Sequence, residues 1–198
     1  GDTWLIKNAM TMASNWSVGG DVTIDAAGSL NGNGWELFLE GSLINNGAFD
    51  YVQATHFVSG HGGNVIQGNF TGSNFFGGIS FNNSSGVWSI NSALDLVFGI
   101  EIQAGAVTGP SGQVLKIGTS FTNNGSFTHN NSILQFQGND PFNNISGSMT
   151  GSNALGNVIV NGPYEFLDPA DIAGNLTING LLIAPSGTLK IGGNFSTI

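Results

Sequence analysis

Charged residues are scarce in this sequence, and positive charge is nearly absent. Asp, Glu, Lys and Arg make up 8% of the 198 residues, against roughly 25% in an average soluble protein. The chain has three Lys, no Arg and a formal net charge of −9. Binding to nucleic acid or to an anionic membrane surface depends on basic side chains. The composition therefore excludes both as expected partners.

Cysteine is also absent, and long apolar runs are missing. Without Cys, the chain can form no disulfide, no thiolate metal site and no Cys nucleophile. No apolar run approaches the roughly 18 residues of a membrane span, so we expect no membrane insertion. No basic and then apolar leader opens the chain. A secreted form would therefore have lost its leader or carry it outside this sequence.

Glycine and alternating apolar residues dominate what is present. Gly accounts for 32 residues, yet 40% of the chain is hydrophobic, which argues against disorder. Apolar and polar residues alternate in 22–24, 35–39 and 133–137, as in β-strands with one buried face. Asn-Gly, Asn-Asn-Gly and Gly-Gly sequences between them supply the positive φ angles of tight corners. The pattern predicts an ordered all-β chain with no significant helix.

An internal repeat of about 77 residues organises the chain. The clearest repeated phrases are Thr-Gly-Ser-Asn (71–74 and 150–153) and Asn-Asn-Gly-x-Phe (45–49 and 123–127). An aromatic residue with an apolar residue two positions later opens each unit, so the units start near residues 4, 88 and 164. We predict a single domain over 1–198, in which the divergent segment 1–19 is an N-terminal cap or an interface.

Two all-β architectures fit short strands separated by Gly and Asn turns. An antiparallel sandwich uses them, and so does a parallel β-solenoid, for which long-period self-similarity is the signature. Asn at repeated corners can also stack into hydrogen-bonded ladders. We favour the solenoid, with three or four coils per unit and roughly 20–25 residues per coil. Stacking at ~4.8 Å would give a rod about 40–45 Å long.

Residues 118–138 carry a likeness to known proteins. They read Gly-Thr-Ser-Phe-Thr-Asn-Asn-Gly-Ser-Phe-Thr-His-Asn-Asn-Ser-Ile-Leu-Gln-Phe-Gln-Gly, and Asn-Val-Ile-Val-Asn (157–161) and Asn-Leu-Thr-Ile-Asn (175–179) continue the pattern. This grammar resembles the repeats of large secreted surface proteins of bacteria. The likeness covers roughly residues 20–198. It implies a right-handed parallel β-helix akin to adhesin and autotransporter passenger domains, in which the repeats act as stalk or scaffold.

Some parallel β-helices are polysaccharide lyases and hydrolases, and the active sites of such enzymes need clustered carboxylates. The densest group is Glu165, Asp168 and Asp171, and a glycosidase pair about 5–9.5 Å apart would fit such a loop. The other repeat units lack this cluster, and no Arg is available to stabilise charge. We expect surface solvation or a weak calcium contact there. No catalytic residue and no bound cofactor is predicted.

The other polar candidates are few. Lys116 and Lys190 occupy equivalent repeat positions, which indicates a solvated outward face. His56 and His61 are five residues apart, an odd separation that sends two side chains of one strand to opposite faces. We expect them, together with His129, to be exposed or turn residues rather than metal ligands.

Tryptophans could stack on sugars if they were exposed. Trp35 and Trp88 lie in alternating segments beside apolar partners, so we expect both in the core. Trp4 and Trp16 fall in the divergent N-terminal segment, and their burial stays open at this point.

The ends of the chain carry the functional prediction. Terminal coils of a solenoid leave N–H and C=O groups unpaired, which invites pairing with another chain, and no charged or helical cap is visible near the C-terminus. We expect a non-enzymatic structural protein, secreted or on the cell surface, that self-associates head to tail or by donating a terminal segment into a filament. One alternative is a stalk fragment of a long adhesin. Another is a carbohydrate-binding or polysaccharide-degrading β-helix, whose partner would be a surface glycan.

Overall fold

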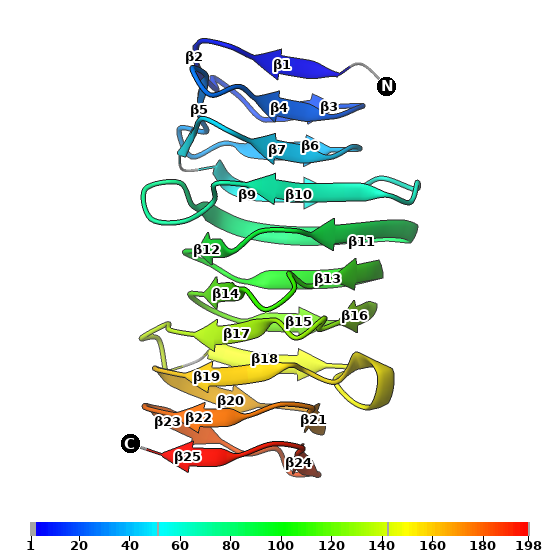
Figure 1. The fold of residues 1–198 in the computed structure, drawn as a ribbon, viewed down its shortest axis with the longest axis vertical. Coiled ribbons are helices and arrows are strands. Elements are labelled where there is room, and N and C mark those ends of the chain that lie inside the picture. Colours follow the sequence, from blue (N-terminus) through cyan, green and yellow to red (C-terminus); the bar gives the residue numbers. More distant parts are fainter. Residues whose placement is uncertain (1–2, 51, 142, 198) are drawn as a thin grey trace.

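The computed structural model describes residues 3–50, 52–141 and 143–197. Within them the chain winds into a parallel β-solenoid of about 9 turns with ~21 residues per coil, standing upright in Figure 1. Its strands pair in parallel ladders, and the one helical element of these residues is the short 3-10 turn η1 (Gly151–Asn153). The solenoid prediction is confirmed over the antiparallel sandwich, and so is the predicted coil length.

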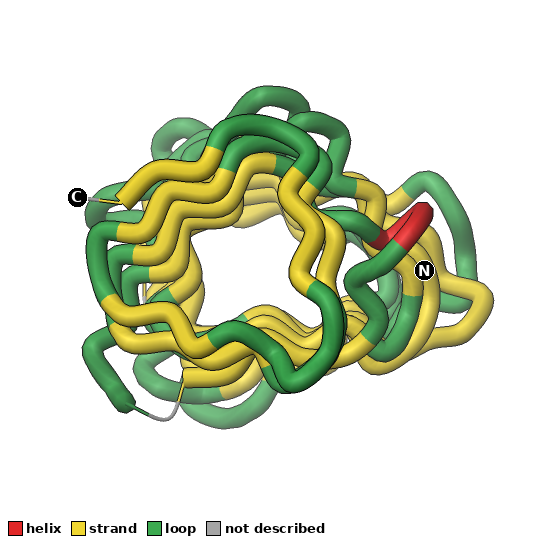
Figure 2. Tube along the Cα trace, turned by 90° about the horizontal axis from the view of Figure 1, so that it is seen from below, coloured by secondary structure: helices red, strands yellow, loops and turns green. Residues whose placement is uncertain are grey.

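Three faces surround the core, and each coil contributes one strand position to each face (Figure 2). The first face holds β1 (Trp4–Ile6), β4 (Val22–Ile24), β7 (Leu43–Asn45), β10 (Asn64–Gly68), the second half of β11 (Phe76–Ile90), the second half of β13 (Ile100–Thr108), β16 (Ser126–Thr128), β21 (Ala170–Ile172) and β24 (Leu189–Ile191). The second holds β2 (Ala9–Thr11), β5 (Ser29–Asn31), β8 (Ala48–Asp50), β12 (Leu94–Leu96), β14 (Val114–Ile117), β17 (Ile133–Phe136), β19 (Asn157–Val160), β22 (Leu176–Ile178) and β25 (Phe195–Thr197). The third holds β3 (Trp16–Val18), β6 (Glu36–Leu39), β9 (Val52–Phe57), the first halves of β11 and β13, β15 (Phe121–Asn123), β18 (Asn143–Gly147), β20 (Pro163–Phe166) and β23 (Leu181–Ile183).

Period-two alternation places every second strand residue inside the rod. In β17 and β19, for example, the burial alternates between half-buried and buried, as expected where one strand face lies inside and the other outside. Because coils stack in register, the inward residues form columns along the axis: Leu115 pairs with Leu134, Leu134 with Val158, and Val158 with Leu176. All four are at most 1% exposed. The core is therefore a continuous stack of apolar columns.

Aromatic rings pack against one another within this core. Phe49 and Phe70 meet edge-on with their centroids 5.3 Å apart, and Phe57 stacks on Phe81 at 5.2 Å. Such pairs contribute about 0.5–1.5 kcal/mol beyond their buried area. Trp88, which is fully buried, lies 5.2 Å from Phe81. The expected burial of Trp88 is confirmed.

Buried asparagines shape two equivalent corners of the repeat. Asn45 and Asn123 are both 0% exposed, and each donates its side-chain amide to a backbone carbonyl of the following coil, that of Asn69 or Ser148. The Asn45 Oδ1 accepts the Gly47 N–H at 3.1 Å. A Cβ at Gly47 would collide with the Gly28 carbonyl of the preceding coil. These contacts explain the repeated Asn-Asn-Gly phrase as corner chemistry.

The sequence repeat is not in register with the coil. A repeat of about 77 residues corresponds to about three and two-thirds coils at ~21 residues each, so each copy starts one face earlier than the last. The first copy of Asn-Asn-Gly-x-Phe connects β7 to β8, on the first and second faces. The second copy connects β15 to β16, on the third and first faces. Equivalent residues therefore progress around the rod instead of stacking.

Asparagine ladders do form, but between neighbouring coils and not between repeat copies. At the C-terminal end the Asn157 Oδ1 accepts from the Asn175 N–H at 3.0 Å, and the Asn175 Oδ1 accepts from the Asn194 N–H at 2.8 Å. Each amide thus satisfies a backbone donor at the start of the next strand of the second face. The predicted ladders are present, with the coil as their period.

Candidate functional site

A groove lies on the outer surface of the third face. It has a volume of about 370 Å³. Its lining comes from five successive strands or the turns before them: Glu36, Gln53, Ala54, His56, Gly78, Ile79, Ser80, Phe98, Gly99, Ile100, Glu101, Thr119, Ser120 and Thr122. The groove therefore runs along the solenoid axis, across β6, β9, β11, β13 and β15.

Small residues make the floor of this groove. Ala54 pairs with Gly78 in the ladder between β9 and β11, and neither carries a side chain long enough to fill the outer surface. A Cβ on Gly78 would lie at an ordinary contact distance of 3.5 Å from the Phe98 Cβ, so nothing forbids a larger residue there. At Gly99, by contrast, a Cβ would collide with the Ser120 carbonyl. The concavity thus depends on missing side chains.

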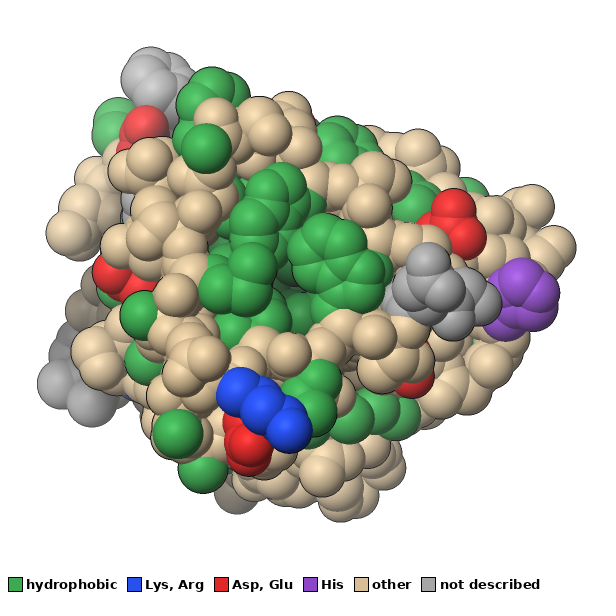
Figure 3. Space-filling model, turned by 90° about the horizontal axis from the view of Figure 1, so that it is seen from above, with side chains coloured by type: hydrophobic (Ala, Val, Ile, Leu, Met, Phe, Trp, Pro, Cys, Tyr) green, Lys and Arg blue, Asp and Glu red, His purple; other side chains and the backbone are tan. Residues whose placement is uncertain are grey.

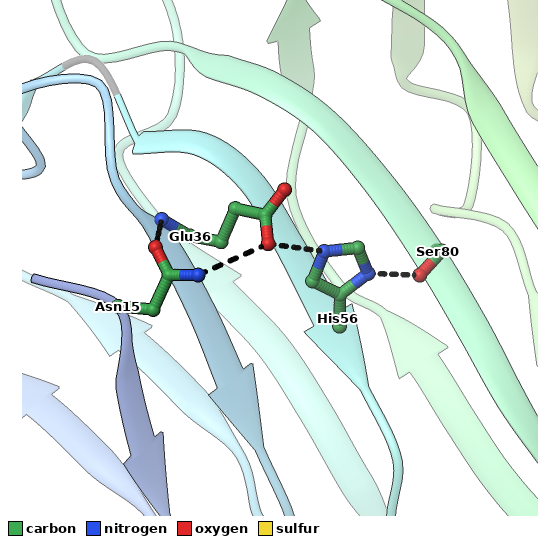
Figure 4. A network of polar contacts seen from close by, with 4 residues as sticks. All are labelled: Asn15, Glu36, His56 and Ser80. Carbon is green, nitrogen blue, oxygen red and sulfur yellow. Dashed lines mark hydrogen bonds and ion pairs between the residues drawn. The ribbon is translucent and has the colours of Figure 1, made fainter.

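A chain of polar contacts forms one wall of the groove (Figure 4). The Asn15 Oδ1 accepts the backbone N–H of Glu36 at 3.0 Å, and its Nδ2 donates to the Glu36 Oε2 at 3.3 Å. The same Oε2 lies 3.8 Å from the His56 Nε2. On the other side of the ring, the His56 Nδ1 is 2.7 Å from the Ser80 Oγ. Four coils thus contribute one side chain each to a single row.

Packing holds the imidazole of His56 in this row. The ring stacks on Phe38 with a centroid distance of 4.5 Å and an interplanar angle of 20°, because Phe38, His56 and Ser80 are in register on successive strands. Its Nε2 is shielded from solvent and makes no hydrogen bond within the described residues. His56 is half-buried, so it is less exposed than the sequence prediction implied.

Ser80, His56 and Glu36 have the composition of an acyl-transfer triad, but their geometry differs from one. In a triad the carboxylate accepts a hydrogen bond from the histidine, and the 3.8 Å between the His56 Nε2 and the Glu36 Oε2 exceeds that range. Ser80 is also only 8% exposed. The arrangement fits a rigid groove wall better than a nucleophile.

A carboxylate and an aromatic ring follow farther along the groove: Glu101 continues the row of His56 and Ser80 on the next strand, and Phe98 lies beside Gly78 of the floor. The Glu101 Oε2 accepts from the Gln103 Nε2 at 2.9 Å, so the carboxylate is oriented while keeping free lone pairs. Phe98, in the turn between β12 and β13, is 40% exposed. The Ser120 Oγ accepts the backbone N–H of Asn144 at 3.1 Å. No Lys lines the groove, so its polar side chains are carboxylates and groups without a fixed positive charge.

Two carboxylates of the predicted acidic cluster bind different backbone N–H groups. Asp168 accepts the backbone N–H of Gly147 at 2.7 Å, whereas Asp171 accepts that of Gly151 at 2.9 Å. Glu165 lies in β20, in register with residues of β18 and β23. Among the described residues, no group of three His, Cys, Asp or Glu side chains is placed to hold a metal ion. The carboxylates of Asp168 and Asp171 instead satisfy corner N–H groups.

Asp171 also belongs to a module that occurs in both repeat copies. In the first copy Asp95 accepts the N–H of Gly72 at 3.0 Å and pairs with Lys116 at 3.0 Å. In the second, Asp171 accepts the N–H of Gly151 and pairs with Lys190 at 3.5 Å. The two lysines were predicted on a solvated outward face, and their side chains are 37% and 71% exposed. They reach back one coil to a carboxylate that holds the Thr-Gly-Ser-Asn turn.

The other histidines and tryptophans lie away from the groove. His61 is exposed in the turn after β9, and His129 is half-buried and accepts the Asn131 N–H at 2.9 Å. Trp35, predicted in the core, is 40% exposed. That prediction was wrong because Trp35 precedes β6 in a turn at Asn33 and Gly34, both at positive φ.

The two ends of the rod leave apolar side chains uncovered. Trp4 and Met10 of the first coil are 37% and 39% exposed, and Trp4 meets Trp16 edge-on at 5.4 Å. Figure 3 looks onto this end and shows apolar side chains at its centre inside a polar rim. At the other end, Phe195, in the inward column of Leu176, is 58% exposed. The segment 1–19 was predicted as a cap or interface, and its described part contains β1, β2 and β3, the three strands of the first coil.

Comparisons with protein-family models, with curated proteins and with solved structures gave no match. No helix of the described residues is long and apolar enough to cross a membrane.

Proposed function

We propose that this chain is a non-enzymatic structural protein that builds an extracellular filament by end-to-end stacking of β-solenoids. The observation that carries the proposal is the continuation of inward columns into open ends. Phe195 is in register with Leu176 and is 58% exposed where Leu176 is 1% exposed. Trp4 is in register with Val22, with 37% exposure against 1%.

The strand edges of the two ends are complementary in arrangement. The first coil offers β1, β2 and β3, and the last strands of the three faces are β24, β25 and β23. A second copy stacked below the last coil could pair its β1 with β24 and its β2 with β25, in parallel and with the same chain direction. This arrangement would leave one strand position open on the third face, between β23 and β3. Exposed strand edges favour pairing with another chain, and a head-to-tail contact that does not close on itself produces a filament.

The resemblance to repeat-rich bacterial surface proteins supports an extracellular setting and also carries the rival proposal, a stalk segment of a long adhesin. In that case further coils of the same chain would cover the ends. Both proposals make the rod a scaffold. They differ in whether the covering coil comes from another molecule.

Electron microscopy of the purified chain at neutral pH tests this proposal. We expect filaments from the unmodified chain and short single rods from Phe195→Asp, which places a charge within the apolar contact. Val87→Asp is the matched control, because Val87 is 44% exposed in the middle of the rod. It should still form filaments. Single rods from the unmodified chain would reject the filament and favour the stalk.

A further inference from the structure

The groove on the third face has dimensions that suit an elongated ligand. It crosses five strands, and four strand spacings of about 4.8 Å give it a length of roughly 19 Å. Hydrogen-bonding side chains recur along it once per coil, from Glu36 through His56 and Ser80 to Glu101 and Thr122. Because His56 and Ser80 are bonded to each other, the groups of this row that remain open to a linear polar ligand are the carboxylates of Glu36 and Glu101, on either side of that pair.

The chemistry of the lining narrows the class of ligand. Two carboxylates, from Glu36 and Glu101, face the groove, and no Lys lies in it. An anionic ligand would therefore be repelled without compensation. The exposed ring of Phe98 offers an apolar surface among these polar groups, as small-molecule sites commonly do.

The polar groups are also oriented before any ligand arrives. Asn15 fixes Glu36 through two hydrogen bonds, and Gln103 fixes Glu101. Each carboxylate keeps acceptor positions for hydroxyl donors, and such charge-assisted hydrogen bonds are the stronger kind. Preorganisation lowers the cost of ordering side chains on binding.

We infer that this groove binds an unbranched, uncharged oligosaccharide. Its hydroxyl groups match the acceptor positions of Glu36 and Glu101, one face of a sugar ring matches Phe98, and a pyranose unit is similar in length to one strand spacing. An extended peptide fits less well, because peptides recognised by β-sheets add to an open edge, whereas the groove lies on the sheet surface, across strands that are paired on both sides. The inference does not depend on filament formation.

Isothermal titration with four hexasaccharides of cellulose, chitin, β-mannan and starch tests the inference, with hexagalacturonate as the acidic probe. We expect at least one neutral probe to bind and hexagalacturonate to bind at least about tenfold more weakly, a difference of about 1.4 kcal/mol. Gly78→Val should abolish binding, because the added side chain fills the floor at an ordinary contact distance. Phe98→Ala should weaken binding about tenfold.

Phe195→Ala is the matched control, since it removes an exposed Phe ring at the C-terminal end and should leave sugar affinity unchanged. Filaments of Phe98→Ala should form normally, so failure of the groove and failure of stacking are separable. The inference is overturned if none of the four neutral probes binds, if hexagalacturonate binds equally well, or if Gly78→Val and Phe98→Ala bind as the unmodified chain does. Binding of an uncharged hexapeptide in preference to the sugars would also reject it.

Discussion

The middle coils and the end coils of this rod follow the same sequence pattern but differ in burial. In the middle, β15 and β17 alternate cleanly between buried and half-buried residues. In the last coil, β24 keeps the alternating pattern in Leu189, Lys190 and Ile191, yet it contains no buried residue. Burial here is therefore set by having a coil on both sides. The same apolar side chain contributes fully to the core only when a further coil covers it.

The largest expected effect comes from deleting one aromatic ring in a covered coil and one in the last coil. Phe136 is 0% exposed and packs 5.1 Å from Tyr164. Phe136→Ala should lower the free energy of unfolding by about 3–5 kcal/mol, because it leaves a cavity. Phe195→Ala in dispersed protein should change it by about 0.5 kcal/mol or less. Denaturant unfolding followed by circular dichroism measures both, and equal losses would contradict the comparison.

Tyr164 lies in β20, which pairs with the terminal strand β23. Substituting Tyr164 tests whether a residue one coil from the C-terminal end is fully buried. Its hydroxyl donates to the Ile117 carbonyl at 3.1 Å and accepts the Gly138 N–H at 2.9 Å. Tyr164→Phe leaves both buried groups without this partner and should cost about 1–3 kcal/mol. Chemical denaturation at pH 7 gives the value. A neutral substitution would mean that water reaches the site.

Ionisation of the Tyr164 hydroxyl should lower the free energy of unfolding at alkaline pH. Burial raises the pKa of Tyr164 above its usual value, so the unfolded chain loses this proton first as the pH rises. The contribution of Tyr164 is complete below about pH 10, and it is lost as the pH rises through the higher pKa of the folded state. The stability difference between the unmodified chain and Tyr164→Phe should shrink between about pH 9 and pH 11. A constant difference would argue against burial of the hydroxyl.

The smallest effects belong to the repeated ion pairs. The Lys116 side chain is 37% exposed beside Asp95, whereas the Lys190 side chain is 71% exposed beside Asp171. Exposed pairs contribute about 0.2–1 kcal/mol, so double-mutant cycles should give a larger coupling for the inner pair than for the outer one. Added salt should reduce both couplings. A stronger outer pair would contradict the view that a covering coil strengthens contacts.

Much of the fold follows from local patterns in the sequence. The alternation in residues 133–137 predicts a strand with one buried face, and the structure has β17 there. The Asn-Asn-Gly phrases predict corners, where Asn45 and Asn123 are found. The length of a coil was also predicted from the sequence, because turn signals recur at a regular spacing. These features depend on residues close together in the chain.

What the sequence did not reveal depends on how coils align with one another. The groove exists because Ala54, Gly78 and Gly99 come to lie on one surface, and their separation of about one coil is informative only once the strand register is known. The same holds for His56 beside Ser80. The prediction that Trp35 is buried was wrong because a turn interrupts the alternation just before β6. The offset of the sequence repeat by one face could not be predicted either, because it depends on how many faces each coil has.

The most direct test of the central claim is a helical reconstruction of the filaments by cryo-electron microscopy. End-to-end stacking predicts an axial rise of about 48 Å per subunit, because the first face spans nine strand spacings from β1 to β24 and the junction adds a tenth, at ~4.8 Å each. It also predicts unbroken strand spacing from β24 and β25 of one copy to β1 and β2 of the next. Rods associated side by side, or a gap in strand spacing at every junction, would contradict the account.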